Sequence, residues 1–181
     1  WDLESADIIK SQEIKDLATA IGSLPGDTDT SNLRYGKICI LADADSDGLH
    51  IATLLCALFL RHYKNLVTSG KIFVSMPPLY RIDAAKEVFY ALDENEKESI
   101  VKRIKKQNSK IKIDIQRFKG LGEMNPSQLR ETVMKPESRR LVQLTLNSSD
   151  NANSVFDLLL SKKRAPDRKE WLEKKGNLAE I

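Results

Sequence analysis

The chain has little cysteine and no long apolar run, and each shortage excludes a class of protein. Cys39 and Cys56 are its only cysteines in 181 residues. No Cys/His cluster has the spacing of a zinc site. With only two cysteines, a reduced, cytoplasmic compartment is expected. The longest apolar stretch, Ile51 to Leu60, is too short to span a bilayer. No signal peptide is recognisable, and no contact with a membrane is expected.

The net charge of the chain is small, but positive charge is concentrated in parts of the sequence. The formal net charge is only +3, from 29 Lys and Arg against 26 Asp and Glu. Residues 102–112 nevertheless hold six basic side chains and no acidic one. Such a cluster can face a phosphate backbone. A solvated helix face is the alternative for each basic cluster taken alone.

Hydrophobic periodicity and turn residues predict an alternation of helices and strands. Helices are expected at 3–22, 50–68, 94–106, 126–134, 152–163 and 167–175, and strands at 37–42, 71–76, 79–82, 88–92, 111–115 and 141–146. In the helix at 50–68, apolar residues between Ile51 and Leu66 are expected to form a buried stripe. Asn125 is the expected N-cap before Pro126. The order strand, helix, strand over 37–76 predicts a βαβ unit and an α/β fold.

Three carboxylates follow the first of these strands directly. Asp43, Asp45 and Asp47 are spaced two apart, so they begin on one face if the strand continues. Like charges this close repel unless a cation holds them, and hard oxygen ligands suit Mg²⁺. A solvated acidic loop closed by Gly48 is one alternative. A calcium EF-hand is another, but its twelfth position would be Leu54, where a bidentate Glu is needed.

A second stretch joins a strand to a helix and has the sequence QRFKGLGEMNP, from Gln116 to Pro126. Its two glycines permit close approach of the backbone, and Arg117 and Lys119 supply positive charge. The stretch can cradle phosphates near a helix N-terminus. It lacks the pattern of a P-loop or of a dinucleotide site. A tight turn that requires glycine explains the residues equally well.

These stretches together resemble one family. The run DADSDGLHI at 43–51 resembles the DxDxDG motif of the Toprim domain in bacterial type IIA topoisomerases. The run MPPLY at 76–80 and the run RFKGLGEMNP at 117–126 resemble later motifs of the same family, in the same order. Within the family, Ser46, Leu49 and the short segment between Tyr80 and Arg117 favour ParE, the B subunit of topoisomerase IV, over the gyrase B subunit, which remains the alternative.

The resemblance implies a fold and a division of the chain. The expected fold is α/β, a Rossmann-like parallel Toprim sheet flanked by helices, with a C-terminal α+β tail. Residues 1–92 would form the Toprim core without its first strand, 93–110 a basic helix and linker, and 111–181 the tail region.

The resemblance also implies site residues, a cofactor and partners. Mg²⁺ would be held by Asp43 and Asp45, with Asp47 assisting directly or through water. DNA would be contacted by His50, Arg168, Arg117 and Lys119. The attacking tyrosine belongs to ParC, the A subunit of topoisomerase IV, in a heterotetramer of two ParE and two ParC chains that acts on duplex DNA. None of the chain's own tyrosines is expected to act as a nucleophile, and His62 is expected on a helix surface.

Two family elements are missing from the sequence. Neither the EGDSA motif, whose Glu completes the metal site, nor the PLRGK segment that lines DNA occurs here. The ATPase domain, which would bind ATP, and the transducer domain are missing too. The expectation is that the chain is part of a longer one, carries no catalytic residue of its own and is inactive alone.

Two other classes of function compete with this interpretation. A phosphatase with an aspartyl nucleophile also places an Asp pair after an apolar strand, but it does not explain Arg117 to Pro126. A non-catalytic module that binds DNA or a partner is the third candidate, because the catalytic Glu is absent.

Overall fold

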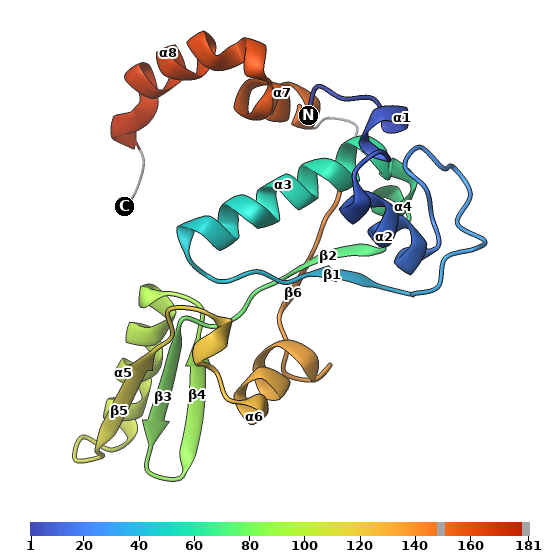
Figure 1. The fold of residues 1–181 in the computed structure, drawn as a ribbon. Helices are drawn as coiled ribbons and strands as arrows, with labels where there is room; N and C mark the ends of the chain where they lie inside the picture. The colour runs from blue at the N-terminus through green and yellow to red at the C-terminus, as the bar shows by residue number, and fades with distance from the viewer. Residues whose placement is uncertain (148–150, 179–181) are drawn as a thin grey trace. The chain divides into compact units, whose positions relative to one another are not determined.

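The computed structural model describes residues 1–147 and 151–178 of the chain, which divides into two compact units (Figure 1). Unit 1 consists of Trp1–Ile38, Leu55–Ile72 and Leu144–Ile181, and unit 2 of Cys39–Leu54 and Phe73–Gln143. Helices and short strands are mixed along the chain, so the predicted α/β class is confirmed. The division of the family's domains at residues 92 and 110 stays a prediction.

Unit 1 is mainly helical. It contains α1 (Ser5–Ile8), α2 (Gln12–Ile21), the second half of α3 (Ser46–His62), α4 (Lys64–Thr68), α7 (Ala152–Leu160) and α8 (Ala165–Lys175), with the 3₁₀ turns η3 (Lys162–Arg164) and η4 (Gly176–Leu178). Its core is formed by the buried side chains of Ala18, Ile21, Ala57, Phe59, Leu60, Tyr63, Leu66, Val67 and Ile72. The rings of Phe59 and Tyr63 lie 5.4 Å apart between centroids.

Two predicted helices are each interrupted in unit 1. The helix predicted at 3–22 is divided into α1 and α2, because Ser11 has extended dihedrals and begins α2. Gly22 ends α2 with φ +77°, and a Cβ there would lie 2.3 Å from the carbonyl oxygen of Asn32. The helix predicted at 50–68 begins earlier, at Ser46, and is interrupted at Tyr63 before α4 begins.

The first sheet has the order β1–β2–β6, from β1 (Ile38–Ile40), β2 (Ile72–Ser75) and β6 (Leu141–Gln143). Helix α3 connects β1 to β2, as the βαβ prediction requires. Strand β6 is antiparallel to β2, with Val74 opposite Val142. The late strand β6 thus returns antiparallel to the βαβ unit, and the other three strands form a sheet of their own.

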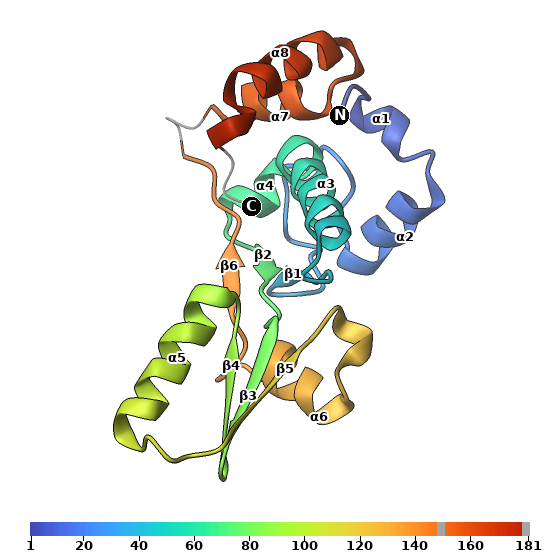
Figure 2. The ribbon, with the colours of Figure 1, turned by 90° about the vertical axis from the view of Figure 1, so that its left-hand side faces the viewer.

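The second sheet belongs to unit 2 and has the order β4–β3–β5, from β3 (Tyr80–Ala84), β4 (Glu87–Ala91) and β5 (Ile113–Arg117). Both pairings are antiparallel, and the two strands predicted at 79–82 and 88–92 form a hairpin as β3 and β4. Its turn contains Ala85, which has φ +55°. Helix α5 (Glu94–Gln107) packs on this sheet around Ile82, Ala84, Ala91 and Ile104 (Figure 2). The carboxylate of Asp93 caps α5 by accepting from the N–H of Glu96 at 2.8 Å.

The predicted start of the helix that follows the RFKGLGEMNP run is confirmed. Asn125 accepts from the N–H of Gln128 at 2.9 Å, and the side chain of Gln128 accepts from the N–H of Asn125. This capping box begins α6 (Pro126–Leu129). The helix continues as a π-helical turn, η2 (Arg130–Met134), rather than as a regular α-helix to residue 134.

Several predictions about burial are wrong. Ile51 and Leu54, expected in the buried stripe of α3, are 52% and 44% exposed. His62 is buried instead of lying on a helix surface, because its ring faces the Ser5 hydroxyl, with Oγ 3.0 Å from Nδ1. Apolar periodicity identifies a face but does not say how much of it other elements cover.

Candidate metal and nucleic-acid site

The acidic loop lies between β1 and α3, and Asp45 begins the helix. Its carboxylate oxygen Oδ1 accepts from the N–H of Gly48 at 2.8 Å, and its carbonyl oxygen accepts from the N–H of Leu49 at 3.0 Å. These bonds make Asp45 the N-cap of α3. The positive end of the helix dipole also favours a carboxylate there. Asp45 therefore has a structural role whether or not it binds a metal.

Gly48 fits a position that admits no side chain. It is buried, and a Cβ built on it would lie 2.0 Å from the carbonyl oxygen of Asp43. The loop therefore folds back on the first turn of α3 more closely than any other residue would permit. This contact fixes the backbone of Asp43 against the helix.

Asp43 joins the acidic loop to the RFKGLGEMNP run. Its Oδ1 accepts from the N–H of Leu121 at 2.8 Å, across 78 positions of sequence. A Cβ on Gly120 would lie 3.0 Å from Oδ2 of the same carboxylate. The close approach that Gly120 permits is thus made by a carboxylate of the protein, whereas a Cβ on Gly122 would meet nothing within 4 Å in the described part of the chain. The backbone N–H at Leu121 neutralises part of its charge.

Hydrogen bonds at Phe118 and Lys119 hold the RFKGLGEMNP run in place. Phe118 is buried and its N–H donates to the carbonyl of Leu79 at 2.8 Å. The N–H of Lys119 donates to the carboxylate of Glu123 at 2.8 Å, around the 3₁₀ turn η1 (Leu121–Glu123). Pro77, Pro78, Phe118 and Met124 line one small hollow, so the MPPLY and RFKGLGEMNP runs pack together.

The predicted site residues divide into three groups by location. Asp43 and Asp45 lie in the acidic loop, and Asp47 and His50 lie exposed in the first turns of α3. Arg117 and Lys119 are exposed at the end of β5 and just after it. All six belong to unit 2. Arg168 belongs to unit 1, where it lies in α8.

Arg168 has partners that the sequence did not suggest. Its Nη1 donates to the carbonyl oxygens of Leu158 at 2.9 Å and Ser161 at 2.7 Å, where α7 ends. Among the described residues, Arg168 forms no ion pair with its neighbours Asp167 and Glu170. Asp167 instead pairs with Arg164, and Glu170 pairs with Lys174. Arg168 therefore joins α7 to α8, which leaves its other nitrogens for a further acceptor.

The carboxylates offer Mg²⁺ a partial set of ligands. Within residues 1–147 and 151–178, no three His, Cys, Asp or Glu side chains are arranged to hold a metal ion together. Asp43 and Asp45 each use Oδ1 for a backbone N–H, and their Oδ2 atoms make no hydrogen bond to the part of the chain that the structure describes. Mg²⁺ commonly takes one or two carboxylates together with phosphate oxygens and waters. The chemistry of this pair fits that requirement.

An apolar hollow of about 260 Å³ lies beside Asp43, and no sequence pattern pointed to it. Ala42, Leu49, Ala52, Val74, Met76, Leu79 and Leu92 line it, with Asp43 and Asp93 at its polar positions. Such surroundings lower the local dielectric constant beside a carboxylate, which strengthens its attraction for a cation.

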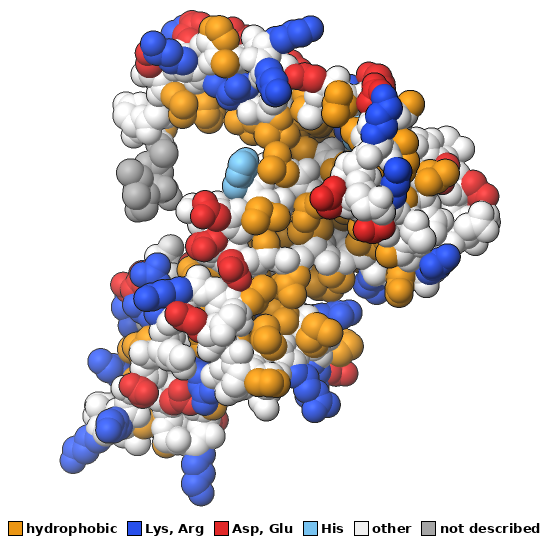
Figure 3. All heavy atoms as spheres, in the orientation of Figure 1, with side chains coloured by type: hydrophobic (Ala, Val, Ile, Leu, Met, Phe, Trp, Pro, Cys, Tyr) orange, Lys and Arg blue, Asp and Glu red, His pale blue; other side chains and the backbone are white. Residues whose placement is uncertain are grey.

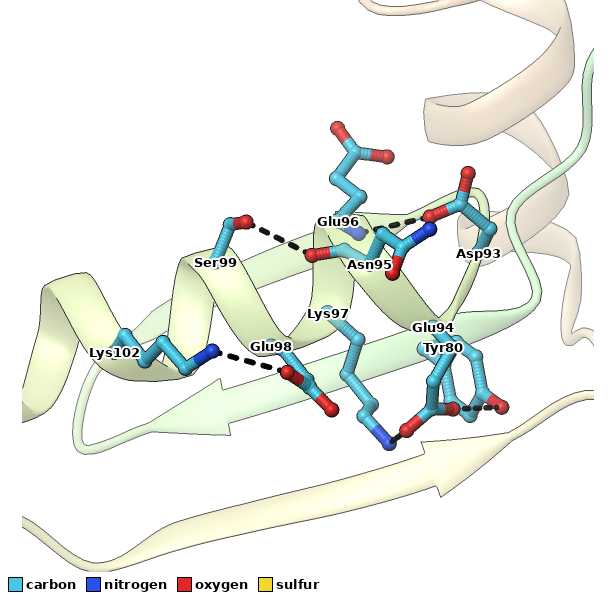
Figure 4. Close-up of polar contacts among 9 residues, drawn as sticks. All are labelled: Tyr80, Asp93, Glu94, Asn95, Glu96, Lys97, Glu98, Ser99 and Lys102. Carbon is cyan, nitrogen blue, oxygen red and sulfur yellow. Dashed lines mark hydrogen bonds and ion pairs between the residues drawn. The ribbon is translucent and has the colours of Figure 1, made fainter.

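Three of the four tyrosines, Tyr63, Tyr80 and Tyr90, lie in positions that suit packing, whereas Tyr35 is exposed. Tyr63 is completely buried, and burial raises its pKa to about 12. Tyr80 donates from its hydroxyl to Glu94 at 2.7 Å, and Lys97 lies over its ring and pairs with the same carboxylate (Figure 4). Tyr90 donates to Glu131 at 3.1 Å. These hydrogen bonds raise the pKa of Tyr80 and contribute, after burial, to the raised pKa of Tyr90.

Comparison with known proteins shows which proteins the chain resembles. Residues 110–173 match the family described as DNA gyrase B subunit, carboxyl terminus. The whole chain is 59% identical to part of the B subunit of DNA topoisomerase 4 from Pseudomonas aeruginosa and covers 29% of that protein. It is 57% identical to the Escherichia coli protein of the same name, of which it also covers 29%. The DNA gyrase B subunit of Thermotoga maritima is 41% identical over 92% of the chain, which covers 26% of that protein.

The chain therefore resembles, over its full length, part of the B subunits of bacterial type IIA topoisomerases. Its similarity to these topoisomerase IV proteins exceeds its similarity to the gyrase protein, so the resemblance to ParE is confirmed. The chain spans about three tenths of the length of the topoisomerase IV relatives it matches.

Proposed function

We propose that this chain forms the Mg²⁺-binding part of the DNA cleavage and religation core of a topoisomerase IV. It would act on duplex DNA with its partner ParC, which supplies the tyrosine, in a cytoplasmic heterotetramer driven by ATP. One observation carries the proposal: Asp43 bonds the backbone at Leu121, so the acidic loop and the RFKGLGEMNP run form one site.

The acidic loop would hold the metal through Asp43 and Asp45, with Asp47 assisting directly or through water. Bound there, Mg²⁺ would neutralise charge on the scissile phosphate. Asp43 is suited to this role because Leu121 and Gly48 fix its side chain and backbone before any ligand binds. Asp45 is oriented in the same way by the N–H of Gly48.

Side chains that donate hydrogen bonds would position the DNA around the acidic loop. His50, Arg117 and Lys119 are exposed in unit 2, and each can donate to a phosphate oxygen. Such contacts fix the register of the duplex without reading its sequence. Arg168 would make a contact from unit 1 with the nitrogens that α7 does not use.

The test is Mg²⁺-dependent DNA cleavage by the full-length protein in complex with its partner. Asp43→Asn is expected to reduce cleavage by about a hundredfold or more, in line with the loss of one charge-stabilising group at a reacting centre. Asp114→Asn is the matched control, because Asp114 is exposed in the same unit and lies on β5. Equal activity of the two variants would sink the metal assignment.

Mg²⁺ binding supplies a second measurement that does not depend on activity. Titration of the chain with Mg²⁺, followed by the chemical shifts of the Leu121 and Gly48 amides, is expected to show saturable changes that Asp43→Asn and Asp45→Asn weaken. Unchanged titration curves in both variants would show that the ion binds elsewhere.

A further inference from the structure

One end of the β4–β3–β5 sheet carries lysines that the cleavage site does not use. Lys86 lies in the turn between β3 and β4. Lys105 and Lys106 lie in the last turn of α5, and Lys110 and Lys112 lie between α5 and β5. All five side chains are exposed, and we call them the distal lysine group.

Strand register brings the two segments of this group together. Ala84 pairs with Glu87 in β4 and with Ile113 in β5. Residues 85–86 and residue 112 therefore leave the sheet at the same end. Figure 2 shows the β3–β4 turn and the loop after α5 at that end. In Figure 3 Lys and Arg side chains project from the end of unit 2 at which Figure 1 draws this turn.

The charge of the distal lysine group is not compensated. None of its members forms an ion pair in the part of the chain that the structure describes. The neighbouring basic residues have partners of their own: Lys102 pairs with Glu98 at 3.0 Å, and Arg103 lies 5.6 Å from the centre of the Phe89 ring. In the sequence, residues 84–88 and 103–113 contain one acidic side chain, Glu87.

Helix stabilisation accounts for only part of this charge. Basic residues in a last turn interact favourably with the helix dipole, which explains Lys105 and Lys106. That effect falls off beyond the last turn. Lys86, Lys110 and Lys112 lie outside the helix, so the dipole gives them no role.

We propose that the distal lysine group binds the phosphate backbone of duplex DNA, as a contact additional to the residues assigned to cleavage. The proposal rests on the proposed function for its choice of ligand. Lysines are flexible point charges that neutralise phosphates without reading bases. Protein interfaces are depleted in lysine and enriched in aromatic side chains, so a protein partner fits this surface less well. The contact is therefore independent of DNA sequence and sensitive to salt.

The test compares two triple variants of equal net charge in binding to a short fluorescent duplex over a range of salt concentrations, without divalent metal. Lys86→Gln/Lys106→Gln/Lys110→Gln removes charge from the distal group. Lys10→Gln/Lys15→Gln/Lys64→Gln removes the same charge from exposed positions in unit 1. The distal variant is expected to lose about three units of salt slope and about tenfold or more in affinity. The control is expected to change affinity by less than about twofold.

Three outcomes would overturn the proposal. Binding by the distal variant that matches the unsubstituted chain would show that the surface has another ligand, such as an acidic protein. An equal loss in both variants would show an effect of net charge alone. Loss of binding in Lys86→Arg/Lys106→Arg/Lys110→Arg, which keeps every charge, would show a structural effect.

The same assay separates this proposal from the cleavage site. The duplex-binding assay contains no divalent metal, so its result does not depend on the metal assignment. If Asp43→Asn leaves cleavage unchanged in the assembled enzyme, the metal assignment fails while the distal result stands. If the distal variant binds DNA normally while Asp43→Asn reduces cleavage, the distal proposal fails and the metal assignment stands.

Discussion

The two halves of α3 differ in what covers them. In the half that belongs to unit 2, Leu49, Ile51 and Leu54 are 61%, 52% and 44% exposed. In the half that belongs to unit 1, Ala57, Phe59 and Leu60 are all buried. The first half begins with the capped acidic loop, and the second half supplies part of a core. One helix thus presents a site at its N-terminus and is anchored by its C-terminal turns.

The difference shows that one helix with a single repeating apolar pattern can be stabilised in two ways. The second half gains stability from burial, at roughly 25 cal/mol per Å² of apolar surface removed from water. The first half contributes through hydrogen bonds of its N-terminus and through close backbone approach at Gly48. Substitutions in the two halves should therefore fail in different ways.

The largest effect is expected from Phe59→Ala. Phe59 is 2% exposed, so truncation leaves a cavity in the core of unit 1 and should lower the free energy of unfolding by about 3–5 kcal/mol. Leu54→Ala, in the exposed half of the same helix, should change it by less than about 0.5 kcal/mol. Urea denaturation measures both. Similar losses in the two variants would mean that both halves are equally covered in solution.

Gly48→Ala should have the next largest effect. The new Cβ would meet the Asp43 carbonyl at 2.0 Å, so the loop must move, at a cost of about 1–3 kcal/mol. Gly36→Ala is the control, because no atom of the described residues lies within 4 Å of a Cβ at Gly36. The moved loop should also weaken Mg²⁺ binding, measured by amide chemical shifts. Normal Mg²⁺ binding by Gly48→Ala would contradict the role assigned to this contact.

Asp45 allows the cap and the metal ligand to be separated. Asp45→Ala should lose about 1 kcal/mol of stability, because the N–H of Gly48 loses its acceptor. Asp45→Ser keeps a capping oxygen and should recover most of that loss. It lacks a carboxylate, so it should not recover Mg²⁺ binding. Recovery of both properties by Ser would show that Asp45 acts only as a cap.

The smallest effect is expected in the pH dependence of stability. Burial lowers the pKa of His62 from its usual 6.5, so the unfolded chain binds this proton more readily than the folded one. Its contribution to stability is complete above pH 6.5 and is lost as the pH falls toward the lower folded-state pKa. His62→Gln should remove this part of the pH dependence, whereas His50→Gln should retain it. Identical profiles for both variants would remove His62 as the cause.

Much of the local structure could be predicted from the sequence. The hairpin of β3 and β4, helix α5 and the Asn125 cap follow from alternation, helical period and cap chemistry over a few residues. The break of the first helix at residues 9–11 could not be predicted, because its apolar period continues across the break. Burial of His62 could not be predicted either, since it depends on Ser5, which is distant in sequence.

The candidate site shows the same division. Acidic side chains after an apolar strand predicted the type of ligand, and the glycines at 120 and 122 predicted close backbone approach. The partner in that approach was not predictable, because the sequence left phosphate binding and a tight turn equally open, and the structure brings the Asp43 carboxylate to Gly120. The structural role of Arg168, which joins α7 to α8, also required the fold.

The sequence by itself determined the resemblance to one family, the order of most elements and the chemistry available in each segment, because motifs, caps, turns and periods act over short distances along the chain. Only the tertiary structure decided that Asp43 meets Leu121, that half of α3 is exposed, and that Lys86 shares one end of a sheet with Lys110 and Lys112. Such meetings depend on strand register and packing between distant segments, and no local pattern encodes them.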